Sequence, residues 1–165
     1  MRIRAVEASE LAELKALRLR ALTDAPGAFG STYEREAARP PEEYRSWIIE
    51  DCVTFVAEDD AGWHGLAVGQ PDRETAGVTH VLSMWVAPDH RRTGIGRLLL
   101  ERTVAWGWDH GAARMRLGVA EGNSAAKRLY LSYGFEPTGH CEPLRSAPSR
   151  MCEFLELAGV AEETG

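Results

Sequence analysis

The feature that most constrains the fold of this chain is a strand, a glycine-rich turn and a long helix that follow one another in mid-sequence. Residues 78–87 (VTHVLSMWVA) are apolar on both faces, with Val78, Leu82, Met84 and Val86 on one and Val81 and Trp85 on the other. Such a strand is typical of the middle of a sheet, where both faces are covered. Pro88 ends the strand, and a helix is expected from about Gly94 to His110. We therefore expect an α/β domain.

The long helix carries two apolar faces. One face is formed by Ile95, Leu98, Leu99 and Trp106, and the opposite face by Leu100, Val104 and Trp108. A helix that is apolar on two sides is either buried on both sides or offers one of them to a partner. We expect other elements of the same chain to cover the second face, and a second subunit is the alternative.

Shorter patterns predict the remaining elements. Helices are expected from Ser9, as the N-cap, to about Asp24, from Pro40 to about Glu50, and from Asn123 to Tyr133. Strands are expected at residues 2–7, 52–59, 62–69, 113–119, 135–140 and 151–157. Residues 1–158 are thus expected to form a single domain, and residues 159–165 a polar tail.

Composition excludes several classes of function. The chain has 165 residues and a net charge of −6, which argues against nucleic-acid and anionic-membrane partners. Its apolar runs are shorter than the ~18 residues of a membrane span, and its N-terminus lacks the apolar core of a secretory signal. A cytoplasmic protein is therefore expected. Cys52, Cys141 and Cys152 lack the spacing of a zinc site or a disulfide framework, so no metal is expected.

The turn after residue 88 has the composition of an anion site. A strand-to-helix turn presents unpaired backbone N–H groups at a helix N-terminus, where a phosphate binds well. Gly94 and Gly96 let the backbone approach a ligand closely, and Arg91, Arg92 and Arg97 add local positive charge. The ATP-type loop is excluded because no Gly-Lys-Ser/Thr follows, and the dinucleotide fingerprint is excluded because its third glycine is missing.

Two motifs in this order resemble the GNAT superfamily of N-acetyltransferases. The segment MWVAPDHRRTGIGRLLL resembles the acetyl-CoA-binding motif, with Arg91, Gly94 and Gly96 at its key positions and Arg92 where glycine is more usual. The segment NSAAKRLYLSYGF (123–135) resembles the second family pattern through Asn123, Ala126, Tyr130, Gly134 and Phe135. The order of the elements also fits, so the resemblance spans about residues 1–158.

The resemblance implies a fold and a cofactor site. The fold would be a mixed, mostly antiparallel sheet of six to seven strands, splayed at its centre and flanked by about four helices. Acetyl-CoA, as cosubstrate, would lie between strands 78–87 and 113–119, where Gly118 suits a close backbone approach. The resemblance assigns its binding to backbone groups of Met84 and Val86, to the turn residues Arg91, Arg92, Thr93, Gly94, Ile95, Gly96 and Arg97, and to Asn123 and Lys127.

The resemblance also implies a reaction. A primary amine of a small molecule or peptide would attack the acetyl thioester directly in a ternary complex, and Tyr130 would return a proton to the sulfur. Glu58, His64 and His80 are candidates for the base, and none is singled out by spacing. Residues 24–32 and 138–149 would frame the acceptor pocket, and a homodimer is a further expectation. The alternative is a non-catalytic acyl-CoA-binding regulatory module, which has no use for Tyr130; a nucleotide-binding domain is disfavoured.

Overall fold

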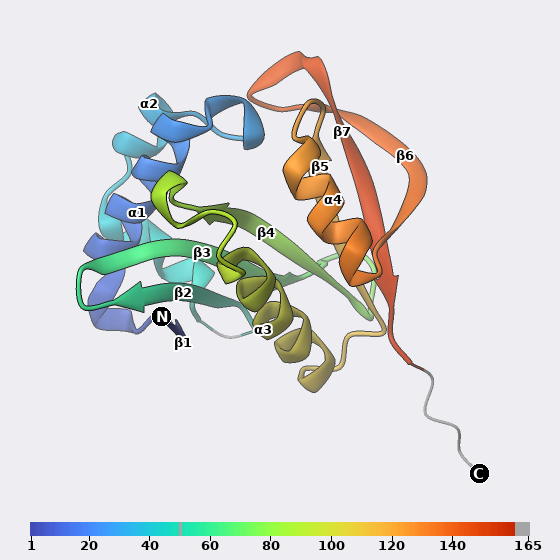
Figure 1. Ribbon diagram of the computed structural model, residues 1–165, viewed down its shortest axis with the longest axis horizontal. Coiled ribbons are helices and arrows are strands. Elements are labelled where there is room, and N and C mark those ends of the chain that lie inside the picture. The colour runs from blue at the N-terminus through green and yellow to red at the C-terminus, as the bar shows by residue number, and fades with distance from the viewer. Residues whose placement is uncertain (50, 161–165) are drawn as a thin grey trace.

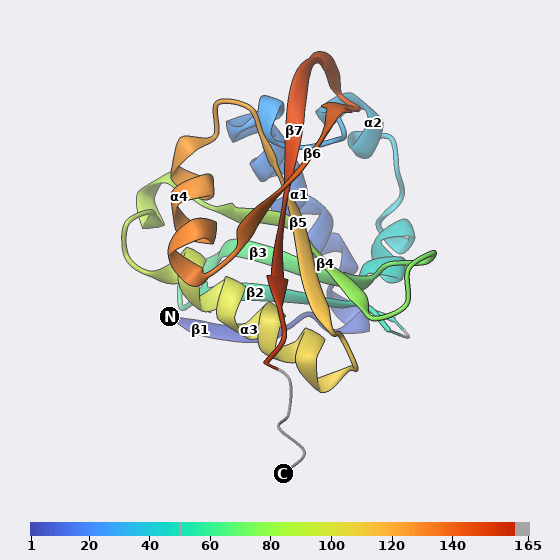
Figure 2. The same ribbon diagram turned by 90° about the vertical axis from the view of Figure 1, so that its right-hand side faces the viewer.

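The computed structural model describes residues 1–49 and 51–160, which form one seven-stranded sheet with helices on both faces (Figures 1 and 2). The strands are β1 (Arg2–Ala5), β2 (Val53–Asp59), β3 (Gly62–Pro71), β4 (Val78–Val86), β5 (Arg114–Ala120), β6 (Glu136–Leu144) and β7 (Ala147–Ala158). The α-helices are α1 (Leu11–Asp24), α2 (Tyr33–Ala37), α3 (Ile95–Asp109) and α4 (Ser124–Tyr133). Short 3₁₀ helices are η1 (Ala8–Glu10), η2 (Pro26–Ala28), η3 (Pro41–Trp47) and η4 (Pro88–His90).

The sheet has the expected mixed, mostly antiparallel topology. Its strand order is β1-β2-β3-β4-β5-β7-β6, and only the central pair β4 and β5 is parallel. The helix α3 serves as the crossover between these two parallel strands. The prediction that residues 78–87 form a central strand is confirmed.

The sheet opens between its two central strands. β4 and β5 pair only where Val78–His80 lies beside Arg114–Arg116. Beyond His80 the two strands separate, although β4 continues for six residues to Val86 and β5 continues to Ala120. The expected splay at the centre of the sheet is therefore present, and it opens toward the turn that follows β4.

A β-bulge in β4 changes which side chains share a face. Leu66 pairs with Trp85 and Val68 pairs with Leu82, so β4 contains one extra residue, and Ser83 in this interval has a left-handed backbone (φ 57°). The assignment of Val81 and Trp85 to one face is therefore wrong. Instead, Val81 packs in one cluster with Met84, whereas Trp85 packs on the opposite side against α1.

Three apolar clusters fill the two faces of the sheet. On one face α1 packs through Leu14 and Leu17 against Val56 of β2, and on the other face α3 packs through Leu99 against Phe55. The second apolar face of α3 is covered within the chain, because Leu100, Val104 and Trp108 pack in a cluster with residues of β5 and α4. This confirms the expectation of intramolecular burial and leaves that surface unsuited to a dimer.

Two local predictions from the sequence are wrong. Ser9 is not the cap of α1, because Glu10 accepts the Glu7 N–H at 2.9 Å and closes a 3₁₀ turn first. The expected helix from Pro40 is the 3₁₀ segment η3, which ends at Trp47; Glu50 lies outside the described residues. Such a short, proline-led segment gains little from α-helical propagation.

The last two strands are longer than their sequence pattern indicates. β6 and β7 form a continuous hairpin joined by Arg145 and Ser146, so most of residues 138–149 is strand. Nearly all of β6 is exposed, which removes the apolar alternation that usually marks a strand. The hairpin tip leans toward the N-terminal helices (Figure 2). No helix among the described residues is long and apolar enough to span a membrane.

Candidate active site

The turn between β4 and α3 presents a row of unpaired backbone N–H groups. Gly94 is the N-cap of α3 and has a left-handed backbone (φ 86°). In the described part of the chain, the N–H groups of residues 92–97 donate no hydrogen bond to the protein. A Cβ placed on Gly94 would meet no atom within 4 Å, so the space above it is open. Free N–H groups at the positive end of a 15-residue helix are well suited to hold a phosphate.

Arg92 has a backbone conformation in the turn that glycine adopts more easily. Its φ is 62°, in the left-handed region that costs a non-glycine residue about 1–2 kcal/mol. This explains how the turn keeps its path although the glycine that the motif usually has is absent. Arg92 is exposed and makes no ion pair with the described residues, so its charge is available to a ligand.

The other two arginines of the turn are engaged by the protein. Arg97 lies 3.4 Å from Glu101 and its guanidinium sits over the Tyr133 ring, 5.4 Å from the centroid. Arg91 binds the carboxylate of Asp24 and donates from Nε to the Val86 carbonyl at 3.0 Å. All three arginines lie at the turn as expected, but in this structure the charges of Arg91 and Arg97 are paired with carboxylates of the protein.

Asp24, the last residue of α1, contacts both the central strand and the turn, which the sequence did not indicate. Its carboxylate accepts hydrogen bonds from Trp85 Nε1, at 2.9 Å, and from Arg91. Burial raises the pKa of Asp24, but these two hydrogen bonds outweigh burial and lower the pKa overall. Asp24 also lines a surface depression of about 430 Å³ between α1 and the end of β4. It therefore joins α1 to both the strand and the turn of the site.

The half of β4 that does not pair with β5 has several partly exposed side chains. Leu82 is 36% exposed, and Ser83, Met84 and Val86 are half-buried, although a central strand normally has both faces covered. Val81–Val86 forms no ladder with β5, as described above. The side chain of Met84 reaches toward the first turn of α3, 3.9 Å from a Cβ placed on Gly96. The splay thus leads directly to the turn between β4 and α3.

Tyr130 of α4 stands beside this opening. It is 5% exposed and packs in one cluster with Val81 and Met84 of β4 and Val119 of β5, which wall the splay. Burial raises the pKa of its phenol above the ordinary value of 10. Its hydroxyl makes no hydrogen bond to the described residues. A protonated phenol with no partner in the protein is the state that a proton donor needs before a ligand binds.

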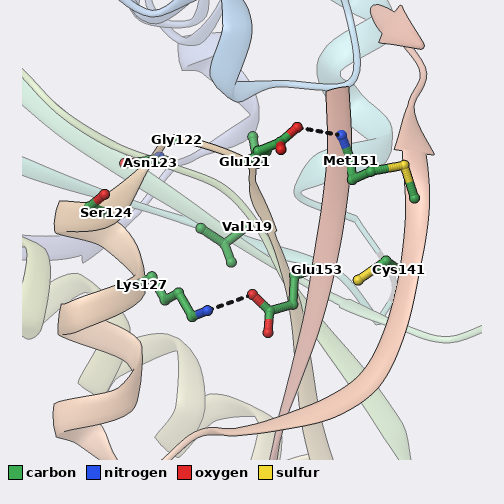
Figure 3. A pocket seen from close by; sticks show the side chains of 10 residues that line it. Val119, Glu121, Gly122, Asn123, Ser124, Lys127, Cys141, Met151 and Glu153 are labelled. Atoms are coloured by element: carbon green, nitrogen blue, oxygen red, sulfur yellow. Dashed lines mark hydrogen bonds and ion pairs between the residues drawn. The ribbon is translucent and has the colours of Figure 1, made fainter. Parts of the chain in front are cut away.

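Asn123 and Lys127 line a pocket of about 340 Å³ between α4 and β7, shown in Figure 3. Asn123 caps α4, because its Oδ1 accepts the Ala126 N–H at 3.4 Å. Lys127 Nζ lies 2.8 Å from a carboxylate oxygen of Glu153 across the pocket. No residue of the turn 91–97 lines this pocket, so Asn123 and Lys127 form a separate group from the phosphate cradle.

The lack of a side chain at Gly118 accommodates the neighbouring strand β7. A Cβ at this position would lie 2.6 Å from Cys152 Sγ and 3.4 Å from Phe154, both on β7. A close approach of the cofactor to the Gly118 backbone, from the edge that faces β4, stays a prediction.

The three candidate bases are spread over the sheet. Glu58 is bound by Arg4 and Arg2, which lower its pKa to about 2. His80 lies in the paired part of β4, where its Nε2 is 2.7 Å from Asp72 Oδ2. His64 lies on β3, with Nε2 2.7 Å from Asp59 Oδ1. None of them lies on the stretch Val81–Val86 of β4, and Glu58 forms ion pairs with Arg2 and Arg4.

A buried ion pair supports the opposite side of the open strand. Arg18 of α1 donates from Nε to both carboxylate oxygens of Glu36, at 2.9 and 3.1 Å, and Tyr44 donates to the same carboxylate at 2.9 Å. Arg18 also points Nη1 at Ser83 Oγ, 3.4 Å away in the bulge. Sequence analysis missed this group, because a charged residue within a helical pattern normally indicates an exposed face.

The two segments expected to frame the acceptor meet on this side. Ser146, at the tip of the β6–β7 hairpin, donates to the carbonyl of Phe29, and Arg150 Nη1 lies 3.4 Å from the carbonyl of Gly27. The loop after α1 and the hairpin are 117 and 123 residues apart at these contacts. They close over the α1 side of the sheet, away from α3 and the turn.

The fold, the splay and the turn together define one class of protein. The chain belongs to the acetyltransferase (GNAT) family, whose model matches residues 17–135. It is 30% identical over 107 residues to the L-amino acid N-acyltransferase MnaT of Escherichia coli, which covers 62% of this chain. The chain spans only 20% to 62% of the length of the curated relatives that it matches.

Solved structures share the whole architecture. A ribosomal-protein-alanine N-acetyltransferase from Brucella melitensis has a TM-score of 0.79 at 23% identity, covering 96% of this chain and 100% of that chain. The putative acetyltransferase yncA from Salmonella typhimurium, with its cofactor acetyl-CoA, has a TM-score of 0.76 at 21% identity, covering 99% and 96%. At these identities the likeness confirms the fold.

Proposed function

We propose that this protein is an N-acetyltransferase that moves the acetyl group of acetyl-CoA to a primary amine. The observation that carries this proposal is the continuity between two features. The row of free N–H groups of residues 92–97 suits a pyrophosphate, and the unpaired stretch Val81–Val86 beside it suits an extended pantetheine arm. Acetyl-CoA joins these two chemical groups in one molecule, and family membership supports the same cosubstrate.

Within this proposal each part of the splay has a role. The N–H groups of residues 92–97 and the guanidinium of Arg92 hold the pyrophosphate, and backbone groups of Met84 and Val86 hold the pantetheine arm. Asn123 holds the arm near its sulfur end. Lys127 would reach a phosphate only after leaving Glu153, so we give it the smaller role.

The reaction is the attack of a neutral amine on the thioester carbonyl in a ternary complex. Holding both substrates in one cleft supplies a proximity advantage of up to about 7–11 kcal/mol. A backbone N–H near Met84 faces the developing oxyanion, and Tyr130 donates a proton to the departing thiolate. The amine proton leaves through water to a base. Glu58 is the weakest of the three candidates, because its lowered pKa makes it a poor proton acceptor.

The acceptor is expected on the α1 side of β4. The exposed side chain of Leu82, the bulge at Ser83, the loop after α1 and the β6–β7 hairpin lie on this side, opposite α3. The E. coli relative is named for L-amino acids and the Brucella structure for a ribosomal protein, so free amino acids and peptide N-termini are the first acceptors to try.

Purified protein with acetyl-CoA and a panel of amino acids, small amines and short peptides tests the proposal. We expect amine-dependent release of CoA thiol, with the acetylated amine found by mass spectrometry. Acetyl-CoA binding with no thiol release on any amine would favour the non-catalytic acyl-CoA-binding module instead. Absence of acetyl-CoA binding would contradict both functions.

A further inference from the structure

A histidine pair and an aspartate meet beside the turn 91–97, and one of them, His64, is also a candidate base for the proposed reaction. Asp59 ends β2, His64 lies two residues into β3 after the hairpin turn, and His90 ends η4. One ligand atom from each of the three side chains lies within 4.8 Å of the other two. The sequence shows no metal motif here, because His90 is 26 residues from His64 along the chain. The fold places His90, just after β4, next to the β2–β3 hairpin.

The chemistry of this cluster is unusual for a purely structural contact. His64 is 8% exposed and its Nε2 lies 2.7 Å from Asp59 Oδ1. The His90 ring stacks on the His64 ring, with centroids 3.8 Å apart and planes 16° apart. His90 Nδ1 is buried and makes no hydrogen bond in the described part of the chain. A buried nitrogen without a partner is costly, and such atoms commonly mark an ion or a function.

We propose that Asp59, His64 and His90 form a binding site for a divalent transition-metal ion of the Zn²⁺ class. Two imidazoles and one carboxylate are a ligand set that Zn²⁺ prefers, and three protein ligands leave a fourth position for water. Asp59 is exposed, which gives the ion an entry path from solvent and lets the carboxylate move. The proposal does not depend on the acetyltransferase assignment.

Metal binding at this site requires a small rearrangement. Nitrogen and oxygen ligands of a tetrahedral Zn²⁺ stand about 3.4 Å apart. The widest separation here, at most 4.8 Å, must therefore shrink by up to about 1.4 Å, and the 2.7 Å contact between His64 Nε2 and Asp59 Oδ1 must widen by about 0.7 Å. An ion lies close to the plane of each imidazole that binds it, so the stacked rings must tilt out of their parallel arrangement. This tilt would let His90, whose Nδ1 has no hydrogen-bond partner among the described residues, bind the ion. Because the His90 carbonyl accepts the Thr93 hydroxyl, an occupied site would also anchor the start of the turn.

The test is titration of the tag-free, metal-free full chain with Zn²⁺ by calorimetry and with Co²⁺ by visible absorption. We expect one ion per chain and ligand-field bands without a strong sulfur-to-cobalt charge-transfer band, which distinguishes this site from binding by cysteine thiolates. The variants His64→Asn and His90→Asn are each expected to weaken binding at least about tenfold. The matched control is His80→Asn, since His80 has the same 2.7 Å contact to an aspartate but lies outside the cluster.

Three results would overturn the proposal. These are no stoichiometric binding by the wild type, equal binding by the wild type and the His90 variant, or equal losses in the His80 and His90 variants. If His64→Asn does not fold, Asp59→Asn replaces it, because this carboxylate is exposed and its removal leaves the core intact. Retention of wild-type affinity in Asp59→Asn together with His90→Asn would equally contradict the site.

Discussion

The carboxylate of Asp24 binds the guanidinium of Arg91 across 67 residues of sequence, and so ties the end of α1 to the turn that precedes α3. Arg91 is the first residue of the acetyl-CoA motif, and its Nε also donates to the Val86 carbonyl. Through these two contacts Arg91 holds the end of β4 and the following turn in place relative to α1. The N–H groups of residues 92–97 stay available for the phosphates that we propose they bind.

Removal of either partner is expected to weaken acetyl-CoA binding. We predict a severalfold rise in Kd for Asp24→Asn and for Arg91→Gln, because the turn loses one of its fixed points. The double variant should show a coupling free energy of about 0.5–1 kcal/mol, modest because Arg91 is half exposed. Calorimetric titration of the four proteins measures this, with Glu43→Gln as a control in an exposed ion pair that does not touch the turn. Additive effects of the two substitutions would show that the contact does not orient the turn.

Tyr130→Phe separates catalysis from packing, since it removes one oxygen and keeps the ring. Expulsion of a thiolate with pKa near ~8.5 into a dry cleft is unfavourable, and a buried phenol stays protonated to supply the proton. General acid catalysis is worth about 10²–10⁴ in rate, so we expect kcat to fall at least about tenfold on a substrate amine. Acetyl-CoA affinity and Tm should barely change.

The matched control for this substitution is Tyr133→Phe, on the same helix and nearer solvent, where burial raises the phenol pKa as well. It should leave kcat unchanged. If kcat of Tyr130→Phe stays within about twofold of wild type, Tyr130 is a packing residue and the acid lies elsewhere.

The buried pair of Arg18 and Glu36 is expected to dominate the acid side of the stability profile. Burial raises the pKa of Glu36, but Arg18 and Tyr44 lower it overall from its ordinary value of 4.5. A carboxyl with a lowered pKa stabilises the folded state fully above pH about 4.5, and this stabilisation is lost as the pH falls further.

Glu36→Gln leaves the Arg18 charge buried without its partner. We predict a loss of about 3–5 kcal/mol in the free energy of unfolding at pH 7, as is usual for a broken buried pair. The difference from wild type should shrink below pH about 4.5, where the wild-type carboxyl takes up a proton. Urea denaturation against pH measures both, and Glu43→Gln in an exposed pair should change stability by less than about 1 kcal/mol. A constant difference across this pH range would exclude the pair as the cause.

The sequence predicts what depends on local pattern and misses what depends on distant contacts. The central strand, the turn and α3 follow from apolar periodicity, from Pro88 and from two glycines, so their positions are predicted well. The bulge at Ser83 is not visible in the pattern, since an extra residue in one strand changes faces without changing composition. Asp24 and Glu36 meet partners 67 and 18 residues away, and no spacing rule links them.

The turn itself gives the most direct measurement. Gly94→Asn keeps the left-handed backbone at small cost, because asparagine tolerates this region, and its side chain enters the open space over the N–H groups. Gly111→Asn is the control, with the same kind of backbone (φ 87°) and equally open surroundings at the far end of α3. Titration with acetyl-CoA should show at least about a tenfold loss of affinity for Gly94→Asn and none for Gly111→Asn. Wild-type affinity in Gly94→Asn would contradict binding of the cofactor phosphates at this turn.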